Sequence, residues 1–183
     1  MLKIVQAPNP VLSQKAKRIA KVDKSVLKLI NDMEESLVAA TDPIGVGLAA
    51  PQVGRSLQLF IAKPTKKSKL LVFINPVIEK FENKTDGEKL KKKNEHKKLE
   101  GCLSLRDIWG EVERYDSVEV SYQDMTGKRH NRRFDGFMAT IIQHETDHLK
   151  GVLFPRRVLE QNGILYKSEK DEKGEDVFEE IKL

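Results

Sequence analysis

The spacing of apolar residues along the chain predicts two helices with several strands between them. The first helix follows Asp23, a residue type that caps helix N-termini, and ends at Asp42, because the residue before a proline is driven out of the helical region. Its apolar residues recur at intervals of four, three and four positions, which places them on one face. They are Val26, Ile30, Met33 and Leu37. The second helix spans about residues 136–150, with Gly151 as its C-terminal stop.

Runs rich in Leu, Ile, Val and Phe predict the strands. Two such runs cover residues 56–63 and 70–78. Residues 117–134 alternate in polarity, turn at 124–127 and return, which is typical of an antiparallel hairpin. Residues 176–183 predict a short final strand. We therefore expect an α+β fold, in which antiparallel sheets pack around the second helix.

Length and composition indicate one folded unit. The chain has 183 residues, 39% hydrophobic and 33% charged, which is too apolar for a disordered protein and fits a single domain over residues 1–183. No apolar run is long enough to span a bilayer, and the first residues lack the apolar core and cleavage site of a signal peptide. We expect a cytoplasmic protein with no membrane partner.

The positive charge is concentrated in one segment. The formal net charge is +5, and residues 63–98 contain 12 lysines against five acidic residues. Within that segment, residues 84–98 predict a solvated insertion loop; contact with RNA phosphates is the functional alternative. No aromatic residues are interleaved for base stacking, and we expect no DNA partner. The tail, residues 168–183, is acidic.

Three residues of the second helix suggest a metal site. His144 and His148 stand four positions apart, so both imidazoles leave one face of the helix and can bind one cation. Glu145 lies beside them and need not be a ligand. This arrangement is used where a metal activates water and a carboxylate takes its proton, although histidine pairs on helices are often ordinary surface or core residues.

A catalytic metal site usually has three protein ligands, so a third donor must come from elsewhere. The chain has four histidines, none of them beyond His148, and Glu160 is one candidate. The better donor is Cys102, whose thiolate suits Fe(II), Zn(II), Ni(II) or Co(II). Because it is the only cysteine, it forms no intrachain disulfide; a lone cysteine is otherwise usually a small buried apolar residue.

Three motifs in order resemble the peptide deformylase family: GVGLAAPQ (45–52), EGCLS (100–104) and QHETDHLKG (143–151). The resemblance extends to about Arg157. It implies a hydrolase that removes the formyl group from the N-terminal formyl-methionine of new polypeptides and releases formate. It further implies that Cys102, His144 and His148 hold one divalent metal, usually Fe(II), with Zn(II), Ni(II) or Co(II) as replacements. Glu145 is then base first and acid second.

The resemblance also implies roles for neighbouring residues. The Gln52 side chain and the Leu103 backbone N–H stabilise the developing oxyanion, although Gln52 alone would fit a loop-capping amide. Glu100 orients a ligand or Arg114.

The substrate is expected to add as a strand along the glycine-rich segment near Val46 and Gly47. An apolar pocket for the methionine side chain is expected; plain core packing is the alternative, and for Leu48 the two interpretations are equal. The residues expected to line or back this pocket are Val46, Leu48, Phe137 and Ile141.

The chain departs from the family at two places. After CLS the family often has proline and glycine, whereas here Leu105, Arg106 and Asp107 follow, which changes the cleft rim. The lysine-rich insertion is longer than expected and suggests that the enzyme associates transiently with the ribosome. We expect the enzyme to be a monomer. Two other classes stay open: an HExxH metallopeptidase with another third ligand, and a non-catalytic metal-binding module.

Overall fold

The computed structural model describes residues 1–83 and 99–182, so the predicted 84–98 insertion lies outside the described residues. The described residues form helices and antiparallel sheets, as the sequence predicts. The helices are α1 (Lys24–Ala39), α3 (Phe137–Leu149) and α4 (Phe154–Glu160), with short 3₁₀ turns η1 (Pro10–Ser13) and η2 (Ala50–Val53). The strands are β1 (Gly47–Ala49), β2 (Leu59–Ala62), β3 (Leu71–Glu82), β4 (Leu99–Cys102), β5 (Leu105–Glu111), β6 (Ser117–Gln123), β7 (Arg129–Asp135), β8 (Leu165–Lys170) and β9 (Asp176–Glu180).

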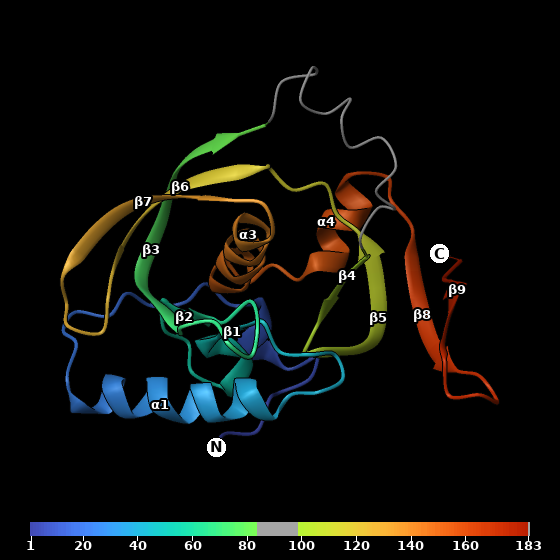
Figure 1. Cartoon of the computed structure of the whole chain (residues 1–183), viewed down its shortest axis with the longest axis horizontal. Coiled ribbons are helices and arrows are strands. Elements are labelled where there is room, and N and C mark those ends of the chain that lie inside the picture. The colour runs from blue at the N-terminus through green and yellow to red at the C-terminus, as the bar shows by residue number, and fades with distance from the viewer. Residues whose placement is uncertain (84–98, 183) are drawn as a thin grey trace.

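Two antiparallel sheets organise these strands. The first has the order β1-β2-β3-β6-β7 and the second β4-β5-β8-β9. The predicted hairpin is confirmed, with Ser117 opposite Asp135 and Gln123 opposite Arg129. Figure 1 shows the first sheet curving around α3, with α4 between α3 and the second sheet.

Helix α1 begins as predicted and ends earlier than predicted. The Asp23 side chain caps it by accepting hydrogen bonds from the N–H groups of Ser25 and Val26. The helix stops at Ala39 rather than near Asp42, because Ala40 is extended and its carbonyl accepts a hydrogen bond from Gly45 N–H. The connection to β1 therefore starts three residues before the proline.

The position of strand β2 explains why its sequence is apolar at every residue. Phe60 and Ala62 belong to the apolar cluster around α3, whereas Leu59 and Ile61 belong to the cluster that contains the buried face of α1. Both faces of this part of the sheet are covered by helices, so a strand without alternation is expected there.

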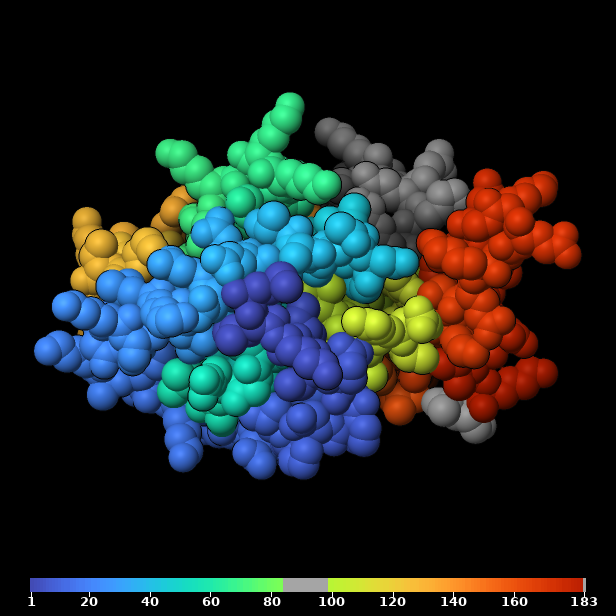
Figure 2. Space-filling model, turned by 90° about the horizontal axis from the view of Figure 1, so that it is seen from below, coloured from blue at the N-terminus to red at the C-terminus, as the bar shows by residue number. Residues whose placement is uncertain are grey.

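The acidic C-terminal segment is part of the second sheet. Strands β8 and β9 form a hairpin that pairs with β5, and Trp109 packs edge to face on Phe178 at 5.9 Å between ring centroids. Strand β9 confirms the predicted final strand. In Figure 2 this hairpin, in red, forms one end of the molecule, beside residues 105–111 in yellow-green. No helix among the described residues is long and apolar enough to cross a membrane.

Candidate active site

Helix α3 presents three chemically active side chains in one buried turn. His144, Glu145 and His148 are 9%, 3% and 1% exposed. The two imidazoles meet edge to face, and their Nε2 atoms are 3.2 Å apart. The helix therefore has the geometry that the spacing of these residues predicts.

Cys102 joins the two histidines from a different element. It ends β4, and its Sγ lies 3.3 Å from His148 Nε2. The three ligand atoms of Cys102, His144 and His148 all lie within 4.8 Å of one another. Glu160 lies elsewhere: it is an exposed residue that pairs with Arg156 and Arg157.

The chemistry of these donors fits a divalent metal. His144 Nδ1 donates to Glu100 Oε1 at 2.7 Å, which leaves Nε2 as the ring atom that faces His148 and Cys102. Burial opposes protonation of His144, but hydrogen bonds with Cys102 and Glu100 outweigh burial and raise its pKa. Burial and the neighbouring charge of His144 lower the pKa of His148. A thiol and two imidazoles gathered in one buried place are typical ligands of Fe(II) or Zn(II).

Gln52 is oriented beside Cys102 by hydrogen bonds at both ends of its amide. Its Oε1 accepts from Ala49 N–H at 2.8 Å, and its Nε2 donates to Cys102 Sγ at 3.5 Å. The side chain therefore accepts from the last N–H of β1 and also directs N–H donors toward the cluster. Leu103 follows Cys102 directly, and its carbonyl accepts from Gln6 Nε2 at 3.0 Å.

Glu145 is buried against strand β1. Its Oε2 is buried with no hydrogen-bond partner among the described residues. Burial raises the pKa of this carboxyl to about 7. A β-carbon placed on Gly47 would overlap Glu145 Oε1, so the glycine allows this close approach.

The structure separates the residues predicted to bind the methionine side chain. Val46 and Ile141 belong to the cluster around α3. Leu48 is fully buried in the opposite cluster, which contains the buried face of α1. Phe137 begins α3 and is 53% exposed.

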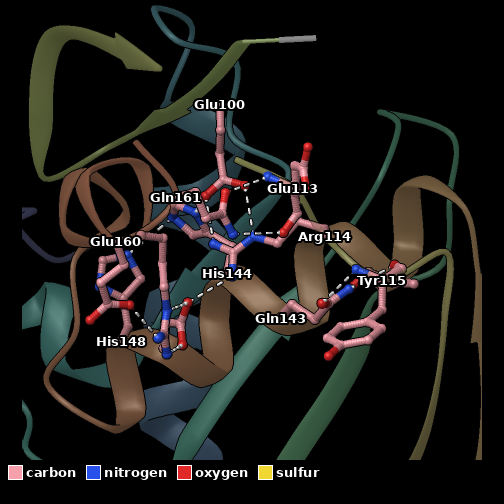
Figure 3. Close-up of polar contacts among 12 residues, drawn as sticks. Glu100, Glu113, Arg114, Tyr115, Gln143, His144, His148, Glu160 and Gln161 are labelled. Carbon is pink, nitrogen blue, oxygen red and sulfur yellow. Dashed lines mark hydrogen bonds and ion pairs between the residues drawn. The ribbon is translucent and has the colours of Figure 1, made fainter. Parts of the chain in front are cut away.

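A buried charge network supports His144 from behind (Figure 3). Arg114 donates twice to Glu100, at 2.7 and 3.0 Å, and once to Asp147, at 2.7 Å. Burial opposes ionisation of Glu100, but the hydrogen bonds from His144 and Arg114 outweigh it and lower its pKa to about 2. Arg157 binds Asp147 from the other side. Sequence reasoning named Glu100 and Arg114 but missed Asp147 and Arg157; an acidic residue inside the histidine motif was the available signal.

The residues that depart from the family lie along β5. Arg106 is exposed, and Asp107 has a positive φ of 61°. Asp107 and Trp109 line a hollow of about 350 Å³ together with Asp42 and Pro43. The altered rim thus borders the loop that leads into β1.

Sequence comparisons place these features in a known family. The sequence model described as polypeptide deformylase matches residues 1–162. Peptide deformylase 1 of Bacillus cereus is 41% identical over 158 residues, covering 86% of this chain and 92% of the relative. Peptide deformylase of Symbiobacterium thermophilum is 39% identical over 176 residues, covering 96% of this chain and 75% of the relative.

Solved structures of peptide deformylases are also similar to this chain. The crystal structure of a peptide deformylase from Synechococcus elongatus in complex with actinonin is similar with a TM-score of 0.74 at 38% identity, covering 88% of this chain and 82% of that one. The peptide deformylase from Thermotoga maritima is similar with a TM-score of 0.73 at 35% identity, covering 86% of this chain and 97% of that one.

Proposed function

Since this chain belongs to the polypeptide deformylase family, we propose that Cys102, His144 and His148 hold its metal and that Glu145 is the general base. The protein is a metal-dependent hydrolase that removes the N-formyl group from the formyl-methionine of newly made polypeptides and releases formate. One observation carries the residue assignment: three buried donor atoms within 4.8 Å, beside a buried carboxylate. In this proposal α3 is the central element of the enzyme.

We propose Fe(II) as the native metal, with Zn(II), Ni(II) or Co(II) as replacements. A thiolate and two imidazoles bind all four cations, so the ligand set supports the class of metal rather than one ion. When bound, the metal supplies Lewis acidity, which polarises a carbonyl and lowers the pKa of water.

Glu145 is suited to move one proton in both directions. With a pKa raised to about 7 by burial, its carboxylate can take a proton from water near neutral pH and its acid form can return that proton. Water adds to the formyl carbon as Glu145 takes the proton. The C–N bond then breaks, formate leaves, and the departing amine receives the proton from Glu145.

Gln52 and Leu103 are proposed to stabilise the negative charge that develops on the formyl oxygen. Support for Gln52 comes from its fixed amide, whose Nε2 faces Cys102. The Leu103 N–H is proposed because it is the backbone donor directly after Cys102 in the chain. Loss of one such donor typically lowers the rate about 100- to 1,000-fold.

The substrate is proposed to pair with the edge strand β1. The Val46 carbonyl, directly before β1, accepts from the N–H of Lys63, directly after β2. The backbone groups of Gly47 therefore lie on the alternate side of the edge strand and are the ones proposed to bind the peptide. Val46 and Ile141 are proposed to contact the methionine side chain, with Phe137 at the mouth of the pocket. Leu48 would support the pocket only through the sheet.

We further propose a cytoplasmic monomer that meets the ribosome transiently through residues 84–98. This proposal rests on the lysine content of that segment, because phosphate contacts need Lys or Arg. Trimming only this segment should abolish co-sedimentation with ribosomes while formate release is retained; unchanged co-sedimentation would contradict the proposal.

Formate release from a short formyl-Met peptide tests the proposed mechanism. The full chain is purified without oxygen, loaded with Fe(II), and compared with Glu145→Ala. We expect wild-type turnover, and a variant that retains its metal but has lost activity. The same peptide carrying an acetyl group is the control. A folded, metal-loaded wild type that releases no formate, or a fully active Glu145→Ala, would overturn the assignment.

A further inference from the structure

Two glutamine side chains clamp the backbone on either side of Arg114 (Figure 3). Gln143 of α3 accepts from Tyr115 N–H at 3.1 Å and donates to Tyr115 carbonyl at 3.0 Å. Gln161, the residue after α4, accepts from Glu113 N–H at 2.8 Å and donates to Glu113 carbonyl at 3.1 Å. Each amide satisfies both backbone groups of one residue, which fixes the segment that carries Arg114.

Asp147 adds a second connection between α4 and Arg114. Its carboxylate accepts from Arg114 at 2.7 Å and from Arg157 at 2.7 and 3.1 Å. The side chains of Arg114 and Asp147 are only 9% and 7% exposed, so their charges depend on these partners. Arg114 in turn binds Glu100, which accepts from His144 Nδ1. An unbroken series of hydrogen bonds thus runs from α4 to the imidazole.

We propose that Arg157 and Gln161 are positioning residues that fix the orientation of the His144 imidazole through Arg114 and Glu100. The proposal rests on the proposed function, in which His144 is a metal ligand. An imidazole whose Nδ1–H is held by a carboxylate presents Nε2 in a fixed direction and as a stronger donor.

His144 is the histidine on which such control acts. His148 Nδ1 is buried without a hydrogen-bond partner in the described part of the chain, so the polar contacts of that ring are those of its Nε2 with Cys102 and His144. His144 Nδ1 by contrast ends the series of charge-assisted bonds. The geometry of the site therefore depends on how firmly Arg114 is held.

A purely structural role, in which these contacts only attach α4 to the protein, is the competing explanation. Helix α4 already has an apolar attachment, because Phe154 and Val158 are 1% and 0% exposed in a cluster with Cys102 and Leu165. Loss of Arg157 or Gln161 should leave that attachment intact, which allows the two roles to be separated by experiment.

The test uses the full chain loaded with Co(II), whose absorption bands report ligand geometry. Arg157→Met, Gln161→Met and Arg157→Lys are compared at 25 °C. Two quantities are measured for each: the d–d spectrum, and the Co(II) dissociation constant by competition with a chromophoric chelator. Thermal unfolding of the metal-free forms reports stability separately.

We expect both Met variants to shift the d–d bands and to raise the dissociation constant by up to about tenfold. Loss of a group that contacts a metal ligand directly lowers metal affinity 10- to 100-fold, and Arg157 and Gln161 lie further from the metal ligands than such groups do. Arg157→Lys should restore part of the loss, because it keeps a cation beside Asp147. Arg156→Met is the matched control: Arg156 also binds Glu160 at 2.9 Å, but it is 68% exposed, and this ion pair is not part of the series that leads to His144.

Unchanged bands and affinity in both Met variants, with only a lower unfolding temperature, would overturn the proposal. If Arg157→Met does not fold, the exposed Gln161→Met decides alone. A wild type without a sulfur-to-cobalt charge-transfer band would instead overturn the proposed ligand set, which is a distinguishable result.

Discussion

Gly47 and Glu145 approach so closely that a β-carbon on Gly47 would overlap the Glu145 carboxylate. The same β-carbon would lie 2.9 Å from Ile141 Cγ2, so it has contacts on two sides. Glycine is thus required at position 47 because a side chain would not fit there, and not because its φ is positive. The edge strand proposed to bind the peptide and the proposed base are thereby kept in direct contact.

Gly47→Ala should therefore displace the Glu145 carboxylate and lower kcat/KM by roughly 100-fold, because a misplacement of about 1 Å can cost that much. Metal content should be unchanged, since Cys102, His144 and His148 are untouched. Formate release and metal analysis together measure both effects.

Gly127→Ala is the control for that variant. Gly127 has a φ of +82° in open space, so alanine there costs stability through backbone strain and leaves turnover unaltered. Full activity of Gly47→Ala would show that Glu145 does not need its present position.

Cys102→Ser should lower metal affinity sharply, because it replaces the thiolate that completes the three-donor cluster. The metal-to-protein ratio after dialysis against a chelator measures this loss. Glu145→Gln, which removes a buried acid beside the same cluster but no proposed ligand, should retain its metal. A Cys102→Ser protein with undiminished affinity would support the alternative of a metallopeptidase with another third ligand.

Periodicity and caps made much of the fold predictable. The stripe of α1, the Asp23 cap and the extent of α3 follow from interactions between residues at most four positions apart. The three site motifs could be recognised for the same reason, because each is a short continuous stretch of the sequence. The early end of α1 was not, because Ala40 is held by a bond from Gly45 rather than by the proline.

Contacts between distant residues could not be predicted from the sequence. Leu48 stands between Gly47 and Ala49, and only the pairing of β1 with β2 decides that its side chain points toward the cluster with α1. Arg157 and Arg156 are identical in type, yet only the fold brings Arg157 to Asp147. Ion pairs of this kind depend on tertiary structure: the histidine motif contains Asp147, but no local pattern identifies Arg157 as its partner.

Asp23→Ala should destabilise the protein by about 1 kcal/mol, because Asp23 Oδ1 accepts from the N–H groups of Ser25 and Val26 at 2.9 and 3.0 Å. For a chain of this size the unfolding temperature should fall by roughly 2–4 °C. The control is Asp32→Ala on the same helix, whose partner Lys28 is exposed; it should change stability by less than about 0.5 kcal/mol. Equal losses in the two variants would argue against capping.

Leu48→Ala separates core packing from a role in the methionine pocket. Leu48 is 0% exposed among residues that pack on α1, so truncation should cost about 2–5 kcal/mol of unfolding free energy. The KM for a formyl-Met peptide should stay within about twofold, a range that corresponds to less than 0.5 kcal/mol.

Ile141→Ala is the matched comparison, because Ile141 is equally apolar and 3% exposed but would contact a β-carbon on Gly47. It should raise KM, by roughly tenfold or more, since a missing methylene in an apolar pocket alone costs about 1–3 kcal/mol. Chemical denaturation and steady-state kinetics on both variants measure the two effects. A large rise in KM for Leu48→Ala with unchanged stability would place Leu48 in the pocket, because only contact with the substrate, and not packing beneath α1, produces that combination.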